Sequence, residues 1–227
     1  MNARAYLAEL LGTFMFMMVG YMSVAAFGLE SVPAPGLLVV PFSFGLGLLA
    51  AIFAFGHVSG GHFNPAVTIA MILDKRTKPV DGIGYIVAQI VGAIGAAAVV
   101  LITVSKEAVA AGTTKPGTGI TDTNALIIET IFTAIFLVVI LTSSKRSGSM
   151  AAVAIPLTLV AIHFALASVT GSSVNPARSI GSALVGGDTA ALWIYLVGPT
   201  IGGIIGWGIF KAMERGEAPE ASEEPAA

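Results

Sequence analysis

Cysteine is absent from this chain, and charged residues are scarce. With no cysteine among 227 residues, disulfide bridges and thiol chemistry are excluded. Asp, Glu, Lys and Arg make up 11% of the chain, whereas an average soluble domain carries about 25%. Hydrophobic residues reach 56%, and the formal net charge is only −2. This composition argues against a soluble protein and favours one that spans a membrane.

The sequence also lacks the motifs of common enzyme classes. It has three histidines but no H-E-x-x-H pair, no glycine-rich phosphate-binding loop with its lysine, and no cysteine nucleophile. Its hydroxyl side chains are spread through apolar segments with no base placed to activate them. We therefore expect no enzymatic activity, no cofactor, no metal site and no nucleic-acid partner.

Uncharged stretches long enough for membrane-spanning helices cover most of the chain. A spanning helix needs roughly 20 mostly apolar residues, and the sequence predicts six of them: 4–28, 36–56, 81–104, 123–143, 149–168 and 190–213. Residues 64–73 form a shorter piece of about 15 Å, half the hydrocarbon thickness. We expect a half-helix there and a second one that starts at Asn175.

Basic residues predict how the chain is oriented in the membrane. In the six-helix topology most of them fall on one side: Arg4, Lys75, Arg76, Lys78, Lys145, Arg146, Lys211 and Arg215. Lys106 and Lys115 fall on the other side. The positive-inside rule then places both termini in the cytoplasm. We expect a single transmembrane domain at 1–213, followed at 214–227 by a disordered, acidic cytoplasmic tail.

The second half of the chain repeats the pattern of the first. Glu9 and Thr13 recur as Glu129 and Thr133, 120 residues later. Three further matches keep the same order: Val40-Pro41-Phe42 with Ile155-Pro156-Leu157, Ser59-Gly60 with Thr170-Gly171, and Tyr85-Ile86-Val87 with Tyr195-Leu196-Val197. Each repeat has three spans, so the second enters from the opposite face, and such folds place their site at the midplane. The predicted repeats of this inverted 3+3, all-α fold are about 1–104 and 121–213.

The triplet Asn-Pro-Ala occurs twice, at Asn64–Ala66 and Asn175–Ala177. Asn is a strong helix N-cap, and Pro suits the first helical position. Each triplet is therefore predicted to begin a half-helix whose positive dipole end lies at membrane depth. Capping occupies the side-chain oxygen, which leaves the NH₂ group free to donate into the space between the half-helices.

Arg178 lies three residues after Asn175, on the same helix face. A guanidinium in an apolar half-helix is costly unless it lines a wet cavity or pairs with a buried acid. The two intramembrane carboxylates, Glu9 and Glu129, are expected toward the cytoplasmic side, whereas Arg178 is expected one turn toward the exterior. The sequence therefore favours a pore-lining role for Arg178.

Together these residues resemble the aquaporin (major intrinsic protein) family, in its water-selective, prokaryotic-type branch. The resemblance rests on residues 59–68, residues 170–179 and the pattern Ala8–Thr13, and it covers nearly all of the chain apart from the acidic tail. It implies a passive channel that conducts single-file water across the cell membrane and excludes protons and ions. It also implies a homotetramer; small residues on the first and fourth helices, such as Ala5, Ala8, Gly12 and Ala134, would allow close packing between protomers.

The resemblance assigns roles to individual residues. The implied selectivity filter consists of Phe44, His163, Ser172 and Arg178, with His163 narrowing the opening in favour of water. The implied ladder of pore carbonyls comes from Gly60, Gly61, His62, Phe63, Gly171, Ser172, Ser173 and Val174. The paired triplets contribute Asn64, Pro65, Ala66, Asn175, Pro176 and Ala177. Glu9 and Glu129 are expected to brace the two loops by accepting their backbone N–H groups.

Two alternatives remain open. A facilitator of glycerol or another small neutral solute has the same framework, although such proteins usually carry Asp after the pore arginine and Lys four residues later, where this chain has Ser179 and Ala183. Leu196 also departs from the water-channel pattern, in which Trp is common. An ion-coupled transporter would instead use Glu9 and Glu129 as relays.

Overall fold

The computed structural model describes residues 2–27 and 36–215, and within these ranges every regular element is helical. The long helices are α1 (Ala3–Phe27), α2 (Gly36–Ser59), α4 (Pro79–Thr103), α6 (Asp122–Arg146), α7 (Ala151–Thr170) and α9 (Leu192–Arg215). The short elements are α3 (Pro65–Leu73), α5 (Lys106–Ala111), the single 3₁₀ turn η1 (Gly148–Met150) and α8 (Pro176–Gly186). The six long helices are long and apolar enough to cross a membrane, so this is a multi-pass membrane protein.

The predicted six spans and two half-helices are confirmed, with shifts of a few residues at their ends. α9 continues to Arg215, so the predicted start of the acidic tail at Glu214 is too early. The remainder of the predicted tail, 216–227, and the predicted end of the first span at Gly28 lie outside the described residues. The short helix α5 was not predicted; Ser105 caps it by accepting a hydrogen bond from the Ala108 N–H at 3.1 Å.

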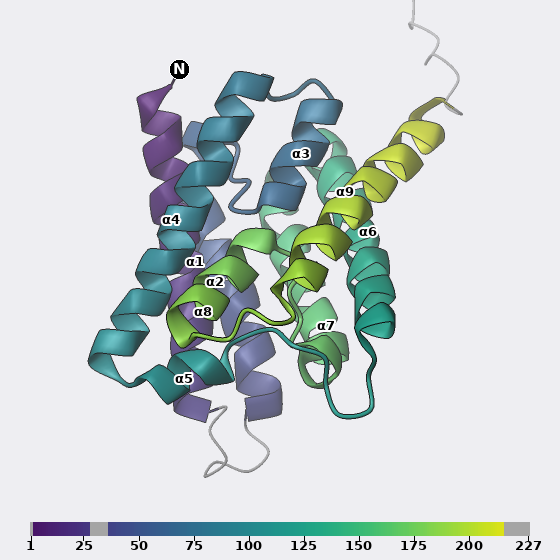
Figure 1. Ribbon diagram of the computed structural model, residues 1–227. Helices are drawn as coiled ribbons and strands as arrows, with labels where there is room; N and C mark the ends of the chain where they lie inside the picture. Colours follow the sequence, from purple (N-terminus) through teal and green to yellow (C-terminus); the bar gives the residue numbers. More distant parts are fainter. Residues whose placement is uncertain (1, 28–35, 216–227) are drawn as a thin grey trace, which may run out of the picture.

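The two repeats are built alike and face opposite ways. α1, α2, α3 and α4 correspond in order to α6, α7, α8 and α9. Figure 1 shows α3 in one half of the molecule and α8 in the other, while α1 begins and α9 ends at the same face. We call this the N-terminal face; α6, which follows an odd number of spans, begins at the opposite face.

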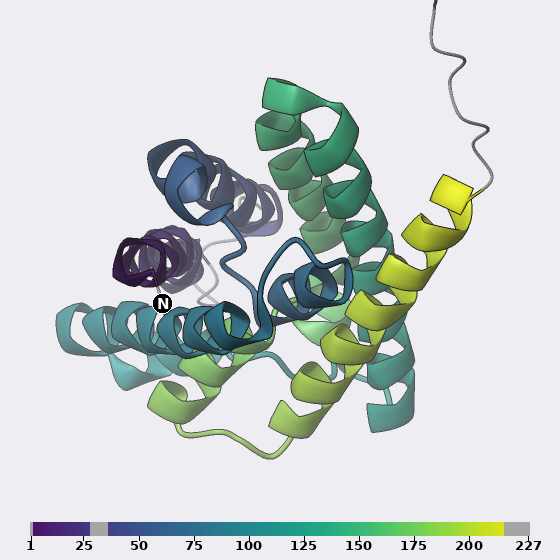
Figure 2. The same cartoon turned by 90° about the horizontal axis from the view of Figure 1, so that it is seen from above.

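The repeats also interlock. α3 packs mainly against α9 of the other repeat, and α8 packs mainly against α4. Figure 2 shows α3 beside the long α9, and α8 beside α4. Neither half-helix is therefore enclosed by its own repeat alone.

Close helix contacts recur at matching places. A Cβ atom on Gly92 of α4 would overlap the Leu10 carbonyl oxygen and lie 3.2 Å from the Thr13 Cβ of α1. A Cβ atom on Gly202 of α9 would overlap the Thr130 carbonyl oxygen of α6 in the same way. Glycine at both positions lets the first and third helices of each repeat approach each other closely.

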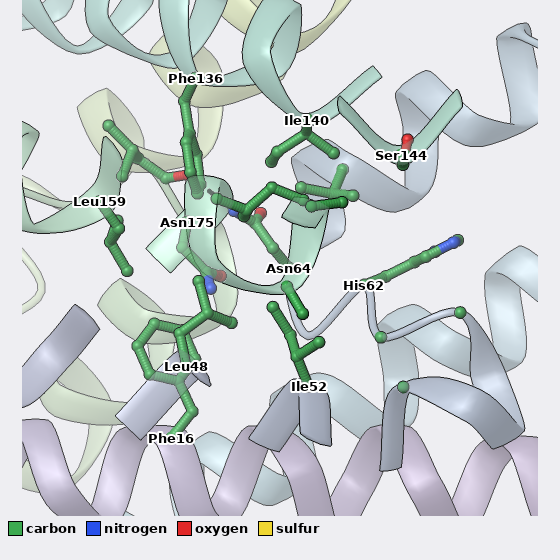
Figure 3. A pocket seen from close by; sticks show the side chains of 18 of the residues that line it. Phe16, Leu48, Ile52, His62, Asn64, Phe136, Ile140, Ser144, Leu159 and Asn175 are labelled. Carbon is green, nitrogen blue, oxygen red and sulfur yellow. Dashed lines mark hydrogen bonds between the residues drawn. The ribbon is translucent and has the colours of Figure 1, made fainter. Parts of the chain in front are cut away.

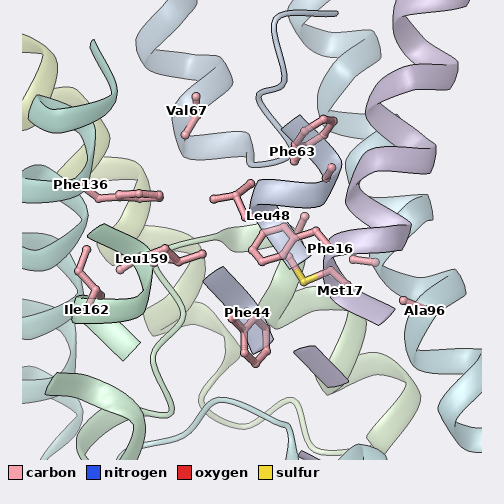
Figure 4. Packing of buried hydrophobic residues seen from close by; sticks show 14 of the residues in the cluster. Phe16, Met17, Phe44, Leu48, Phe63, Val67, Ala96, Phe136, Leu159 and Ile162 are labelled. Carbon is pink, nitrogen blue, oxygen red and sulfur yellow. The ribbon is translucent and has the colours of Figure 1, made fainter. Parts of the chain in front are cut away.

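The core surrounds the place where the half-helices meet. Figure 4 shows Phe16, Leu48 and Leu159 facing the same central space. The small residues that the sequence suggested for contacts between protomers are instead buried within one chain: Ala5, Ala8, Gly12 and Ala134. Gly12, for example, lies directly against the Phe63 ring. Because these residues pack within one chain, they do not form the surface that was expected to contact neighbouring protomers.

Candidate functional site: two loops and a constricted cavity

The loops that precede the half-helices take the same unusual conformation. Positive φ angles fall at three matching pairs of positions: Gly60 (93°) and Gly171 (77°), Gly61 (66°) and Ser172 (50°), Phe63 (49°) and Val174 (43°). Left-handed backbone is sterically costly for residues other than glycine, above all for a β-branched one such as Val174. Surrounding contacts must therefore hold both loops in place.

In the first loop Glu9 provides most of those contacts. One carboxylate oxygen accepts hydrogen bonds from the Ser59 hydroxyl at 2.6 Å and the His62 N–H at 2.9 Å. The other accepts from the Phe63 N–H and from the Gln89 side-chain amide, both at 2.7 Å. Glu9 is fully buried, so its four donors offset the loss of water around the charge.

Glu129 does the same for the second loop. Its carboxylate accepts from the Thr170 hydroxyl at 2.7 Å, the Ser173 N–H at 3.0 Å and the Val174 N–H at 2.8 Å. The expectation that both glutamates lie toward the same side is wrong. Glu129 is in the second turn of α6, which begins at the opposite face, and it binds the loop that leads to Arg178.

Both asparagines cap their half-helices. The Asn64 side-chain oxygen accepts from the Ala66 N–H at 2.9 Å, and the Asn175 oxygen accepts from the Ala177 N–H at 3.0 Å and the Arg178 N–H at 3.3 Å. Pro65 and Pro176 occupy the first helical positions. The local chemistry expected from the sequence is therefore present at both helix starts.

The asparagine amides also join the two loops to each other. The Asn64 NH₂ group donates to the Val174 carbonyl at 2.8 Å, and the Asn175 NH₂ group donates to the Phe63 carbonyl at 2.9 Å. The expectation that both NH₂ groups are entirely free is thus corrected, because one N–H of each is used between the loops. The second N–H of each amide is left to donate elsewhere.

Some carbonyl oxygens of the expected ladder already accept one hydrogen bond within the protein. The carbonyl oxygens of Phe63 and Val174 accept from the asparagines, and that of Gly171 accepts from Nη2 of Arg178 at 3.2 Å. Five members of the expected ladder line the cavity described next: Gly60, Gly61, His62, Ser173 and Val174.

A cavity of about 480 Å³ runs past both asparagines. Figure 3 shows Asn64 and Asn175 close together among apolar side chains. At the N-terminal face the cavity is lined by His57, Ser144 and Ser149, where α2 and α6 end and α7 begins. The sequence analysis assigned no pore role to the large apolar side chains of its wall: Phe16, Leu48, Ile52, Val67, Met71, Phe136, Ile140, Ile155 and Leu159.

The deep end of the cavity is a constriction formed by Phe44, His163 and Arg178. The rings of Phe44 and His163 stack, with centroids 4.6 Å apart and 28° between their planes. The guanidinium carbon of Arg178 lies 5.3 Å from the Phe44 ring centroid. The exposed fractions of the three residues are 0%, 2% and 4%, so little space remains between them.

Polar atoms in this constriction are arranged as one acceptor and a cluster of donors. His163 Nδ1 lies 3.0 Å from the Leu159 carbonyl, which can only accept, so Nδ1 carries the proton and Nε2 is left as an acceptor. Nε2 of His163 and Nε of Arg178 have no hydrogen-bond partner among the described residues. Arg178 donates to the carbonyls of Gly112 and Gly171, and no carboxylate of the described residues is bonded to it.

Ser172, the fourth residue expected in the filter, does not line this cavity. It is fully buried, its N–H donates to the Thr170 hydroxyl at 3.3 Å, and its own hydroxyl has no partner among the described residues. The structure thus brings three of the four expected filter residues together around the cavity.

Comparison with known proteins agrees with this architecture. The family described as Major intrinsic protein matches residues 1–210. A protein named Glycerol uptake facilitator protein-like 6, from Lactiplantibacillus plantarum, is 40% identical over 213 residues, which cover 89% of this chain and 94% of that protein. Aquaporin Z of Photorhabdus laumondii is 39% identical over 225 residues, covering 92% of this chain and 97% of its own length.

A solved structure shows the same fold. The X-ray structure of the aquaglyceroporin from Plasmodium falciparum superposes with a TM-score of 0.82 at 24% identity, covering 92% of this chain and 96% of that one. Paired half-helices around a constricted cavity define a membrane channel of the aquaporin type. The chain belongs to the major intrinsic protein family.

Proposed function

We propose that this protein is a water-selective channel. The observation that carries the proposal is the constriction. There the imidazole of His163 lies beside Phe44 and Arg178, and all three side chains are almost inaccessible to solvent. Nε2 of His163 is an acceptor and Nε–H of Arg178 is a donor, and neither has a hydrogen-bond partner among the described residues. A water molecule can satisfy both, whereas a polyol needs more room and a longer series of partners.

Exclusion of protons and cations follows from the middle of the cavity. The second N–H of Asn64 and of Asn175 offers two donors to a passing water, which can then present only its oxygen there. Both half-helices also begin at this point, and each contributes a partial positive charge of about half an elementary charge. Arg178 adds a full positive charge closer to the opposite face. These groups disfavour hydronium and metal cations while leaving neutral water unhindered.

Conduction of glycerol is the second candidate, because one relative carries the name of a glycerol uptake facilitator-like protein. The apolar wall of the cavity would suit a carbon chain. Against it, Ser179, where facilitators usually carry Asp, is already bonded to the hydroxyls of Ser173 at 2.6 Å and Thr114 at 2.8 Å. That position is used to hold the loop.

Ion-coupled transport is disfavoured by the state of the two glutamates. Every carboxylate oxygen of Glu9 and Glu129 accepts at least one hydrogen bond from a loop or a neighbouring helix. A relay would have to protonate these oxygens. Each oxygen of Glu9 already accepts two hydrogen bonds, so a proton there would displace a donor, and most of these donors hold the strained loop. We infer that both residues brace the loops.

The positions of charged and apolar residues also bear on the orientation of the channel in the membrane and on its oligomeric state. We infer that both termini are cytoplasmic in the cell membrane, since Lys75, Arg76, Lys78 and Lys145 all lie at or next to helix ends of the N-terminal face. We also infer a homotetramer, each protomer having its own pore. Many large apolar residues remain exposed on the outer helix faces, where lipid or neighbouring protomers would cover them.

Stopped-flow light scattering on reconstituted vesicles tests the proposal. We expect fast shrinkage in sucrose and slow glycerol entry for the native chain. Removing the imidazole in His163→Gly should raise the ratio of glycerol to water permeability about tenfold, since it removes one wall of the constriction. Leu48→Ala is the matched control, because it also enlarges the cavity but outside the constriction. Glycerol entry as fast as water flow in the native chain would refute water selectivity.

A further inference from the structure

A tyrosine outside the cavity supports the constriction from behind. Tyr21 on α1 is 3% exposed, and its hydroxyl donates a hydrogen bond to the backbone carbonyl of Arg178. Its ring meets the Phe44 ring edge-on, with centroids 6.4 Å apart and 80° between the planes. The same ring lies 5.9 Å from the guanidinium carbon of Arg178.

The space around Tyr21 and Phe44 is shaped for this contact. A Cβ atom on Gly20 would overlap the Phe44 ring, so glycine there lets the ring lie against α1. Phe16, also on α1 and one turn before Gly20, meets the Phe44 ring edge-on, with centroids 6.1 Å apart. Phe44 is therefore fixed by α1 on one side and by the stacked imidazole of His163 on the other.

The internal repeat supplies a comparison for this residue. The position of α6 that corresponds to Tyr21, 120 residues later, is Leu141, which is also fully buried. Packing at this level of the fold thus needs only an aliphatic side chain. The aromatic ring and the hydroxyl occur in the repeat whose first helix contacts Arg178, so they have a use beyond filling the core.

We propose that Tyr21 is a positioning residue for the constriction. Its ring holds Phe44 by edge-to-face packing and holds the Arg178 guanidinium by a cation–π contact. Its hydroxyl fixes the first turn of α8 through the Arg178 carbonyl. Together these contacts keep two walls of the opening from moving apart, and so set its width. This inference rests on the proposed function of Phe44, His163 and Arg178 as the selectivity filter.

Two substitutions at Tyr21 test the proposal in reconstituted vesicles. Tyr21→Leu introduces the residue that the chain already packs at the corresponding position of α6. We expect it to raise the ratio of glycerol to water permeability about fivefold, which corresponds to about 1 kcal/mol, a modest value for the loss of one cation–π contact. Tyr21→Phe keeps the ring and loses the hydroxyl, so the ratio should rise about twofold.

Tyr6→Phe is the matched control. Tyr6 lies on the same helix, and its hydroxyl donates to Asp81 at 2.8 Å, far from the constriction, so the ratio should stay at the native value. If Tyr21→Leu folds and its permeability ratio is unchanged, the role of Tyr21 is overturned. If the leucine variant does not fold, an unchanged ratio in Tyr21→Phe overturns it. Arg178→Ala in the same series separates the two proposals. If it leaves the ratio unchanged, the filter assignment fails; if it alters the ratio while the Tyr21 variants do not, only the present inference fails.

Discussion

The two ends of the cavity are related by the internal repeat, yet they carry different side chains. At the constriction stand Phe44, His163 and Arg178. Their counterparts toward the N-terminal face, at the same offsets in the repeat, are Leu159, Leu48 and Val67. The constriction therefore combines an aromatic ring, an imidazole and a guanidinium, whereas the three counterpart side chains are all aliphatic.

The backbone around these two sets is closely matched. Both loops have positive φ at the same three positions, both are bound by a buried glutamate, and both donate an asparagine amide to the partner loop. The repeated framework thus places both loops within the membrane, holds them rigid and supplies the asparagine donors at the centre of the cavity. Discrimination between solutes is left to the few positions at which the repeats differ.

The largest expected effect tests whether the two glutamates are equivalent. Each carboxylate oxygen of Glu9 accepts hydrogen bonds from two donors. Glu9→Gln replaces one of these oxygens with an NH₂ group and leaves two donors unpaired. At about 2 kcal/mol per unpaired donor, the free energy of unfolding should fall by about 4 kcal/mol. Glu129→Gln can direct its NH₂ group at the single donor Val174 N–H and should cost about 2 kcal/mol. Thermal unfolding in detergent measures both, and equal losses would contradict this difference.

A second substitution makes the constriction resemble its counterpart. Arg178→Val installs the residue found at the corresponding position, Val67, and removes one wall together with its charge. We expect the ratio of glycerol to water permeability to rise about tenfold, which corresponds to about 1.4 kcal/mol. Val67→Ala enlarges the aliphatic end by a similar step and should change the ratio by less than about twofold. Similar effects of both variants would show that discrimination is not confined to the constriction.

The smallest expected effect tests how far the symmetry of the framework holds. Tyr85 donates to the Ser59 carbonyl and Tyr195 to the Thr170 carbonyl, each at 2.8 Å. Replacing either with Phe removes one buried hydrogen bond and should cost about 1 kcal/mol. The two losses should agree within experimental error in thermal unfolding, while the permeability ratio stays unchanged. A clear difference between them would mean that one loop is held more tightly than the other.

Much of this architecture could be predicted from the sequence because it depends on local or repeated signals. Length and hydropathy gave the six spans, and the capping chemistry of Asn64 and Asn175 gave the half-helices. The repeat offset paired Glu9 with Glu129. A wrong assumption about direction misplaced Glu129, since its depth depends on where α6 enters the membrane.

The missed features are contacts between distant segments. Nothing near Asn64 in the sequence indicates that its amide meets Val174, and nothing near Arg178 indicates that Gly112 accepts its guanidinium. Tyr21 was likewise overlooked, because a tyrosine in an apolar helix has no local signature for a partner in another repeat. The apolar wall of the cavity could have been found by applying the repeat offset to each lining position in turn.

The interlocking of the half-helices constrains how this protein is made. α3 packs mainly against α9, the last of the described helices to be synthesised, so this neighbour is missing while the preceding helices are made. Asn64 gains its partner Val174 earlier, when the loop before α8 has been made. Enclosure of α3 is therefore completed only after α9 has been inserted, and a chain truncated before α9 would leave α3 without its main neighbour.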